Sequence, residues 1–342
     1  MKNIIFVFIF STLSFSEICD LNNDSSLNIV DIVIMVNSIL NEGNEYCDLN
    51  GDNELNIIDV VQMVNLVLYG MNIELIHVPQ GDFSNPGNNE TQTIDYDYKI
   101  GKYEITNQQY LHYLNSAIDE NQIWIDDCID NIGEFCVNGN YESNNQIIEK
   151  SFFILGNPYS YMLNDYNFGV IQFIDSEFQV NNVIYLDHPV VQVSWYGANH
   201  FAEYFELRLP TLNEWMRAAK AESNFSWPWG GGGDMHLKIN VLNSQYNIPE
   251  GFTYPWGDGT TPVGFYKEYN NMIDNSSSFG IYDLIGNASE WILDPVLYNG
   301  NLKLSVGGSW DWSAYNSRLK WNSKYSTGNP NWSSGFRIVQ DY

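Results

Sequence analysis

Oxygen-bearing side chains recur at the same intervals in two short stretches near the N-terminus. The stretches begin at Asp20 and Asp48; in each, oxygen side chains occupy positions 1, 3, 5, 9 and 12, and position 7 offers its main-chain carbonyl. This is the ligand spacing of the twelve-residue EF-hand loop, which surrounds calcium with hard oxygen ligands. We therefore predict two calcium sites, with these ligands: Asp20, Asn22, Asp24, Ser26 and Asp31 in the first, and Asp48, Asn50, Asp52, Glu54 and Asp59 in the second.

Both loops depart from the commonest EF-hand pattern and lead directly into an apolar segment. Position 12 is Asp rather than Glu, and Ser25 and Asn53 replace the usual Gly at position 6. Because Asn accepts the left-handed backbone needed there more readily than Ser, the first site is expected to be the weaker one. The apolar segments at 29–40 and 57–68 predict one helix after each loop.

A pair of loop–helix units with Asp at position 12 resembles a dockerin, the module that docks onto cohesin domains in extracellular assemblies. The resemblance covers residues 17–70. It implies a small all-α module and a cohesin-like partner bound through loop positions 10 and 11, which are Ile29, Val30, Ile57 and Ile58. The alternative is that these four apolar residues only pack the two helices together.

The N-terminus predicts export. A charged start is followed by a short apolar run at 4–10 and by small residues, so a secretory signal peptide would occupy 1–16, with cleavage after Ser16. Retention as an anchor, or as a lipoprotein through Cys19, is the alternative, although Ile18 is a poor neighbour for a lipidated cysteine. We expect a secreted, extracellular protein that a scaffold could hold at the cell surface.

Export makes the four cysteines candidates for disulfide bonds. Cys19 and Cys47 occupy equivalent positions of the repeat, and Cys128 and Cys136 lie eight residues apart in a polar segment. Pairing Cys19 with Cys47 and Cys128 with Cys136 is the simplest of the three connectivities. Four free thiols are the alternative.

The acidic composition argues against several classes of partner. The chain has 342 residues, with 42 acidic and 14 basic side chains and a formal charge of −28. Such a field repels phosphate backbones and anionic headgroups, so we expect no nucleic-acid or membrane-surface binding. No stretch after the signal is long and apolar enough to predict a membrane span. The 44% of hydrophobic residues suffices for a packed core.

Beyond residue 73 the sequence alternates short helix and strand signals. Candidate helix N-caps stand at three places: Thr106, Ser194 and Thr211, the last in a capping box with Glu214. Residues 120–186 are rich in Asn and aromatic residues and have poor periodicity. They predict a long inserted loop with short strands, such as 178–180 and 183–185. From these residues alone, the region is an irregular α+β domain.

Six motifs follow one another along the same region. They are Glu104-Ile-Thr-Asn107, His188-Pro-Val-Val-x-Val-Ser-Trp195, Arg208-Leu-Pro-Thr-x-x-Glu-Trp215, Gly280-Ile-Tyr-Asp283 with Gly286-Asn-x-x-Glu-Trp291, Gly307-Gly-Ser-Trp310 and Gly335-Phe-Arg337. Their types and order resemble the formylglycine-generating enzyme (sulfatase-modifying factor) family over residues 74–342. The resemblance implies an α+β variant of the C-type-lectin fold, with short elements, many turns and bound calcium.

The resemblance also marks the positions of the family's chemistry. In members that oxidise a substrate cysteine, two cysteines follow the Gly-Gly-Ser and capture copper. The corresponding residues here are Trp312 and Ser317, neither of which supplies a thiolate. We therefore expect a catalytically degenerate site without copper. Ser309 and Trp291 match retained active-site positions, but both also suit a structural turn and a core.

The resemblance raises two further kinds of metal site. Asn287 and Glu290 match the calcium-binding Gly-Asn-x-x-Glu-Trp of the family, and simple turn hydrogen bonds are the alternative. The iron-dependent sulfoxide synthases, another branch, hold their metal with three histidines. The five histidines of this chain show no ligand spacing.

The leading hypothesis is an exported, dockerin-bearing protein whose large domain binds a glycan or a peptide. Exposed aromatic side chains would line the binding face, drawn from Trp310, Trp312, Trp321 and Trp332. The alternative is that most of these tryptophans belong to the core. One alternative is an active enzyme of the superfamily, for sulfatase maturation or other oxidative chemistry. Another alternative is a structural spacer on a surface assembly.

Overall fold

The chain forms two compact units, Met1–Asn72 and Ile73–Tyr342. Their structure, a computed structural model, describes residues 19, 21–22, 29–41, 47, 55–57, 59–60, 63–64, 73–85, 90–129, 135–143, 145–155, 170–221, 225–231, 238–241, 259–267, 273–295, 302–319, 324–326 and 328–342. The predicted signal peptide lies outside these residues. Among them, no helix is both long and apolar enough to span a membrane.

The first unit is built around helix α2, Ile29–Asn41, which confirms the helix predicted after the first loop. Residues 57, 59–60 and 63–64 of the second predicted helix are also helical, and the rest of that segment lies outside the description. The buried core contains Ile32 and Met35 from α2, Val60 and Met63 from the second segment, and the disulfide between Cys19 and Cys47. The Cα atoms of this disulfide are 5.5 Å apart.

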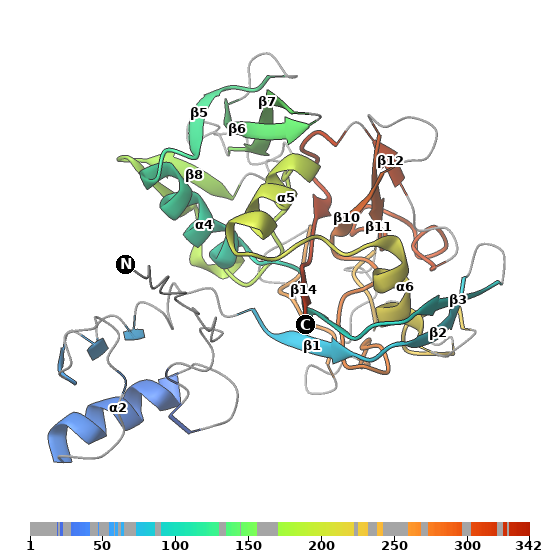
Figure 1. Ribbon diagram of the computed structural model, residues 1–342, viewed down its shortest axis with the longest axis horizontal. Coiled ribbons are helices and arrows are strands. Elements are labelled where there is room, and N and C mark those ends of the chain that lie inside the picture. Colours follow the sequence, from blue (N-terminus) through green and yellow to red (C-terminus); the bar gives the residue numbers. More distant parts are fainter. Residues whose placement is uncertain are drawn as a thin grey trace, which may run out of the picture. The chain divides into compact units, whose positions relative to one another are not determined.

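The second unit mixes short helices with short strands (Figure 1). In chain order its elements are β1 Leu75–Val78, β2 Gly81–Ser84, β3 Thr91–Ile94, β4 Tyr98–Gly101, α4 Asn107–Asp119, β5 Ile123–Asp127, β6 Phe135–Ser143, β7 Gln146–Ile154, β8 Ile171–Ile174, β9 Glu177–Val180, the 3-10 helix η1 Val183–Tyr185, α5 Trp195–Tyr204, α6 Leu212–Lys220, β10 Ser289–Pro295, β11 Lys303–Val306, β12 Lys324–Ser326, β13 Ser334–Gly335 and β14 Val339–Asp341. The predicted mixture of helices and strands is confirmed.

Several small sheets take the place of one large sheet. The strand orders are β1-β4-β14, β12-β11-β10-β13, β5-β6-β7, β2-β3 and β8-β9. In the first sheet the C-terminal strand β14 pairs with β4, so the end of the chain lies beside the start of this unit (Figure 1). In the second sheet β10 pairs with β11 and β13, which brings the Gly286–Trp291 motif next to the segments that flank Gly307 and Gly335.

The three predicted helix caps are confirmed. Thr106 and Thr211 both form full capping boxes, with Gln109 and Glu214 returning a hydrogen bond to the cap residue. The Ser194 side chain accepts a hydrogen bond from the main-chain N–H of Gly197. These caps fix where α4, α6 and α5 begin, because each satisfies N–H groups that the first helical turn leaves without partners.

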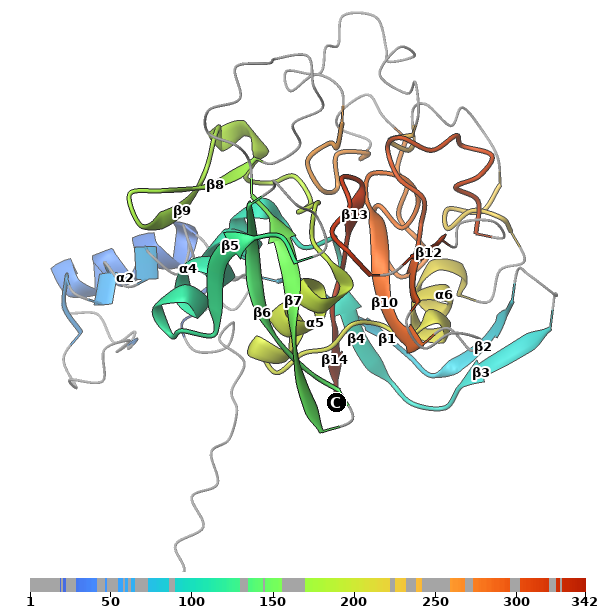
Figure 2. The same cartoon turned by 90° about the horizontal axis from the view of Figure 1, so that it is seen from above.

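The insertion at 120–186 is more regular than the sequence predicted. The nine-residue strands β6 and β7 form an antiparallel hairpin that β5 extends (Figure 2). The prediction of a strand at 183–185 was wrong, because η1 forms there. The main-chain N–H of Ile184 donates to the side chain of Asn182, and that of Tyr185 donates to the Asn182 carbonyl, so a turn forms despite the β-branched residues.

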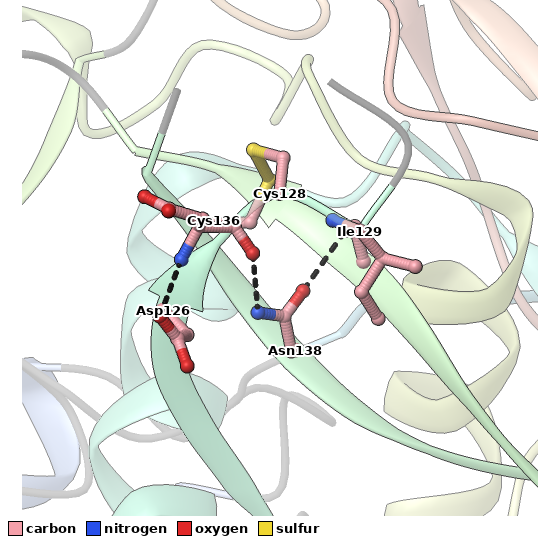
Figure 3. The surroundings of a disulfide bond; sticks show 7 residues. Asp126, Cys128, Ile129, Cys136 and Asn138 are labelled. Carbon is pink, nitrogen blue, oxygen red and sulfur yellow. Dashed lines mark hydrogen bonds between the residues drawn. A yellow bond between two sulfur atoms is a disulfide. The ribbon is translucent and has the colours of Figure 1, made fainter. Parts of the chain in front are cut away.

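A second disulfide joins Cys128, the residue after β5, to Cys136 in β6 (Figure 3). Its Cα atoms are 4.9 Å apart, and Cys136 pairs with Asp126 in the β5–β6 ladder. The adjacent Asn138 donates to the main-chain carbonyl of Asp127 at 3.2 Å. The bridge thus ties the chain that leaves β5 to the strand beside it.

Candidate functional site

The turn after β11 requires two consecutive glycines. Gly307 and Gly308 have φ values of 93° and 70°, in the region that favours glycine. A Cβ added to Gly308 would lie 2.4 Å from the Ser317 hydroxyl oxygen and 2.7 Å from the Ser317 Cβ. Position 317 therefore packs directly against the main chain of the turn.

The two positions that the resemblance matches to the family's cysteine pair hold no group suited to copper. Ser317 is fully buried, and its hydroxyl donates to the Ser313 carbonyl at 3.1 Å. Trp312 is half-buried, and its main-chain N–H donates to the Ser309 carbonyl at 2.9 Å. An indole and a hydroxyl in these places offer no thiolate, so these residues do not fit a copper ion.

The loop beyond the turn carries a carboxylate, Asp311, that belongs to none of the sequence motifs. The Asp311 carboxylate accepts hydrogen bonds from the hydroxyl of Ser309 and from the indole N–H of Trp332, the latter at 3.0 Å. Trp332 is 54% exposed, and Tyr315 is 63% exposed beneath the guanidinium of Arg318, 3.8 Å from the ring centroid. The loop therefore presents aromatic surface together with fixed charges.

Trp310 and Trp312 are half-buried, so only part of each ring adds to this surface. Trp321 lies outside the described residues. The only sequence signal for Asp311 was an acid two residues after Ser309. Such spacing carries no specific chemistry until the fold brings Trp332 to it.

The Gly-Asn-x-x-Glu-Trp motif holds the glycine turn in place. The N–H of Gly286 donates to the Gly307 carbonyl, and the N–H of Trp310 donates to the Asn287 carbonyl, both at 2.9 Å. The Asn287 side chain donates to Glu104 at 2.7 Å and accepts from the N–H of Thr261 at 2.9 Å. Asn287 is therefore a positioning residue in this structure, with its amide group occupied by protein partners.

Glu290, predicted as a calcium ligand beside Asn287, forms a buried ion pair in this structure. Its two carboxylate oxygens accept from Arg337 at 2.6 and 2.7 Å, and one also accepts from the indole N–H of Trp215 at 2.8 Å. Glu290 and Arg337 are both fully buried. Because a cation at Glu290 would have to displace the guanidinium, the residues as arranged do not fit a calcium ion.

Trp291, the other retained position, is also part of the core. Its indole is 1% exposed and donates to the Val193 carbonyl at 3.0 Å. This bond joins β10 to the segment that precedes α5. The structural interpretation of Trp291 accounts for all that the structure shows of it.

Two more buried acids lie near the ion pair. Glu104 and Asp283 are both buried, and one guanidinium, Arg337, faces them and Glu290. Burial, together with the charges of Asp283 and Glu290, raises the pKa of Glu104 well above its usual value, and Arg337 opposes that rise. Burial also raises the pKa of Asp283, against hydrogen bonds from Gly264 and Asn275.

The histidines do not converge on a site. Those described are His77, His112, His188 and His200, and His236 lies outside the description. Burial lowers the pKa of His188 to about 3, so this imidazole is neutral at physiological pH. Within the described part of the chain, no group of three or more His, Cys, Asp or Glu side chains is arranged to hold a metal ion.

In the first unit, position 12 of each predicted calcium loop is fully buried. Asp31 accepts from the N–H groups of Leu21 and Asn22 at 2.8 and 3.2 Å, and Asp59 accepts from the N–H of Asn56 at 2.8 Å. Asp31 thus reaches back from α2 to the start of its own loop. The other predicted ligands lie outside the described residues: Asp20, Asp24, Ser26, Asp48, Asn50, Asp52 and Glu54.

The apolar residues at loop positions 10 and 11 face solvent. Ile29 is 62% exposed, Val30 47% and Ile57 67%, whereas Ile32 on the next turn is buried. Ile58 lies outside the described residues. Side chains this exposed add little to the packing of the unit, which weakens the alternative that they only hold the helices together.

Comparison with known proteins identifies the large unit. The family described as "Sulfatase-modifying factor enzyme 1-like domain" matches residues 69–342. The chain belongs to this family. Every motif named above, from Glu104 to Arg337, lies within the residues that match this sulfatase-modifying-factor domain.

Of two curated relatives, one is named as an inactive protein and the other as an enzyme. "Inactive C-alpha-formylglycine-generating enzyme 2" of Mus musculus is 33% identical over 129 residues, covering 36% of this chain and 38% of the relative. "Formylglycine-generating enzyme" of Mycobacterium tuberculosis is 34% identical over 107 residues, covering 30% of this chain and 32% of the relative. The chain thus spans about a third of the length of these curated relatives.

One solved structure supports the sulfatase-modifying-factor fold. PvdO from Pseudomonas aeruginosa superposes with a TM-score of 0.51 at 16% identity, covering 79% of this chain and 95% of that one. At this identity the likeness concerns the fold alone.

Proposed function

We propose that this chain is a secreted binding protein, whose sulfatase-modifying-factor domain binds a glycan or a peptide and does not generate formylglycine. A calcium-dependent, dockerin-like module of the first unit would dock it onto a cohesin-like partner in an extracellular assembly. The proposal includes a C-type-lectin-like fold for the large unit and an all-α fold for the module. The main support for the proposal is that Trp312 and Ser317 stand in place of the cysteine pair.

Oxidation of a substrate cysteine in this family depends on a pair of thiolates that capture copper. An indole cannot replace a thiolate, and the hydroxyl of Ser317 is packed against Gly308, where it already donates to a carbonyl. The exposed rings of Tyr315 and Trp332, beside Asp311 and Arg318, instead suit recognition of a ligand. These features favour binding over oxidation.

The activity is tested by incubating the full chain with copper(I), oxygen and a cysteine peptide that formylglycine-generating enzymes accept. We expect no aldehyde in the peptide by mass spectrometry and no stoichiometric copper on the protein after desalting. The Mycobacterium tuberculosis enzyme serves as the positive control. Aldehyde formation would overturn the proposal and support the enzyme alternative.

The spacer alternative is tested with arrays. Fluorescently labelled full chain would be applied to glycan and peptide arrays in millimolar calcium. We expect ligands of one class to be retained. A blank result on both arrays would instead support a structural spacer.

The docking role rests on the exposed apolar pair Ile29 and Ile57, and on Asp31, which contacts its own loop. If these residues face a cohesin-like partner, burying two Ile side chains would supply several kcal/mol of binding free energy. A charge in either place would oppose that burial.

Interferometry over a panel of immobilised cohesin domains tests the docking role. We expect binding in calcium, loss of binding in EGTA, and at least a roughly tenfold weaker affinity for the Ile29→Asp/Ile57→Asp double variant. Leu40→Asp is the matched control, because Leu40 is 73% exposed near the other end of α2. Binding that ignores EGTA would contradict the proposal.

A further inference from the structure

A hollow of about 400 Å³ lies between the β6–β7 hairpin and α5. Among the described residues, its lining comes from 140–152 and 196–203, and neither the glycine turn at 307–308 nor Trp332 is part of it. Figure 2 shows α5 beside the long hairpin. The volume lies within the range of small-molecule sites, about 300–1,000 Å³.

The sequence places four polar or aromatic side chains of α5 on one face toward this hollow. Tyr196, Asn199, His200 and Glu203 follow the i, i+3, i+4, i+7 spacing of a single helix face. The helix comes close to β7 at Gly197, where an added Cβ would lie 2.4 Å from a main-chain oxygen of the strand. Any larger residue there would push α5 away from the hairpin and change the hollow.

The floor of the hollow is made of uncharged rings. The rings of Phe152 and His200 have centroids 5.0 Å apart, and Phe152 is fully buried. His200 Nδ1 is 2.7 Å from the hydroxyl of Tyr113. Burial lowers the pKa of His200, so the imidazole is neutral at pH 7 and brings no positive charge to the floor.

Tyr141 from the hairpin and Tyr196 from α5 form an aromatic wall. Their centroids are 5.0 Å apart and their planes meet at 64°. Two ammonium groups lie near the Tyr196 ring, Lys150 at 4.9 Å and Lys303 at 5.6 Å from its centroid. These cations would repel a positively charged ligand brought to the same wall.

The remaining lining consists of three amides and two carboxylates: Asn140, Asn145, Asn199, Glu142 and Glu203. Each amide offers both donors and an acceptor, and each carboxylate offers only acceptors. The Asn199 amide donates to Glu203 at 2.9 Å, which fixes both groups on the helix. The carboxylates, in a chain of charge −28, disfavour anionic ligands.

We propose that this hollow binds a neutral mono- or disaccharide. Sugar hydroxyls donate and accept like the amides around them, adjacent hydroxyls can both donate to one carboxylate, and an aromatic wall suits the C–H face of a pyranose ring. The inference rests on the proposed role of the large unit as a binding domain, and it places a sugar site between the inserted hairpin and α5, separate from the surface formed by Tyr315 and Trp332. The site needs no metal.

Saturation-transfer NMR with the full chain tests the proposal. The probes are methyl α-glucopyranoside, methyl α-mannopyranoside, methyl β-galactopyranoside and cellobiose, with glucuronic acid as the anionic counterpart. We expect transfer to at least one neutral probe and weaker transfer to glucuronic acid. For the neutral probe that binds, the Asn140→Ala/Glu203→Gln variant should have a dissociation constant at least about tenfold higher.

The matched control is Asn181→Ala/Glu177→Gln, because it makes the same two changes at exposed residues outside the hollow. Transfer to none of the neutral probes would overturn the proposal, as would equal transfer to glucuronic acid. If a sugar binds equally to both double variants, this site is wrong while the binding role of the domain stands. Aldehyde formation in the copper assay, by contrast, would remove the proposed function itself.

Discussion

Arg337 is the cation that the buried acids of the large unit share. It makes two hydrogen bonds to Glu290 and donates to the carbonyls of Gly101 and Tyr282 at 2.9 Å. Removing one partner of a buried ion pair strands the other charge in a medium that solvates it poorly. Arg337 therefore matters to stability more than an exposed arginine would.

We predict that Arg337→Met lowers the free energy of unfolding of the large unit by about 3–5 kcal/mol. All 11 tryptophans lie in this unit, so urea denaturation followed by tryptophan fluorescence reports on it alone. Arg318→Met, at an exposed ring contact, is the control and should change stability by less than about 1 kcal/mol. Equal effects of the two changes on the free energy of unfolding would show that the buried pair contributes no more to stability than the exposed contact of Arg318.

Lys303 lies in a cage of aromatic rings, with its Nζ 3.3 Å from the centroid of Trp195. Burial, and then the charge of Lys150, lowers the pKa of Lys303 to about 8. In the unfolded chain the lysine pKa is about 10.4. Between these values the unfolded state binds more protons, so this group makes stability rise as pH increases through that window.

Lys303→Met should abolish that rise. We expect the urea midpoint of the wild type, relative to that of the variant, to be higher at about pH 9.5 than at about pH 7.5. Lys99→Met, which removes a half-buried lysine of β4, is the comparison for the loss of a lysine charge outside this cage. A constant difference between wild type and Lys303→Met at both pH values would mean that the cation–π contact with Trp195 outweighs burial.

At the scale of elements, α6 begins at a capping box that is also an ion pair. Glu214 accepts from the N–H and hydroxyl of Thr211 at 2.7 and 2.8 Å, and from Arg208, which also binds Asp341. Burial opposes ionisation of Glu214, but hydrogen bonds from Arg208 and Thr211 outweigh it and lower its pKa. Its stabilising effect is therefore present above the unfolded pKa and lost as pH falls through the lowered one.

We predict that Glu214→Ala costs about 1–3 kcal/mol at pH 7, against about 1 kcal/mol for Thr106→Ala, which removes a cap without a charge. The Glu214→Ala deficit should shrink as the pH falls below about 4. Urea denaturation at the two pH values measures both. A deficit independent of pH would show that packing of the side chain, rather than its charge, stabilises α6.

Elements set by local chemistry were predictable from the sequence. The caps at Thr106, Ser194 and Thr211 depend on residues three apart, so the sequence shows them directly. The β6–β7 hairpin was not predictable, because its burial does not alternate with period two and its register depends on pairing across the insertion. The same pairing creates the hollow beside α5, which no single segment reveals.

The candidate site was likewise predictable where it depends on nearby residues, and not where it depends on distant ones. The motif spacing located Trp312 and Ser317, and packing against Gly308 then shows why position 317 is closed. The ion pair of Glu290 was not predictable, since an acid in a calcium motif cannot be told from an acid in an ion pair until Arg337, 47 residues away, is seen beside it. Asp311 was missed because its partner Trp332 is also distant in the sequence.

For the whole molecule, the two units differ in how their stability can arise. The first unit has a core of a few side chains around one disulfide, whereas the second buries several large aromatic residues in one core. A domain as small as the first is expected to need a disulfide or a metal. If the paired loops bind calcium as proposed, its removal should affect the first unit and leave the second unchanged.

We predict that EGTA lowers the protection of α2 against hydrogen exchange. For each calcium site whose dissociation constant is 1,000-fold below the calcium concentration used, the loss should be about 10³-fold, equivalent to about 4 kcal/mol. Exchange in α4 and tryptophan fluorescence should not change, which separates the two units in one sample. Asp31→Asn should reproduce the loss at the first loop, while Asp119→Asn, at an exposed residue of α4, should not. Unchanged exchange in α2 on chelation would show that the disulfide and core suffice, and that the paired loops do not depend on calcium for folding.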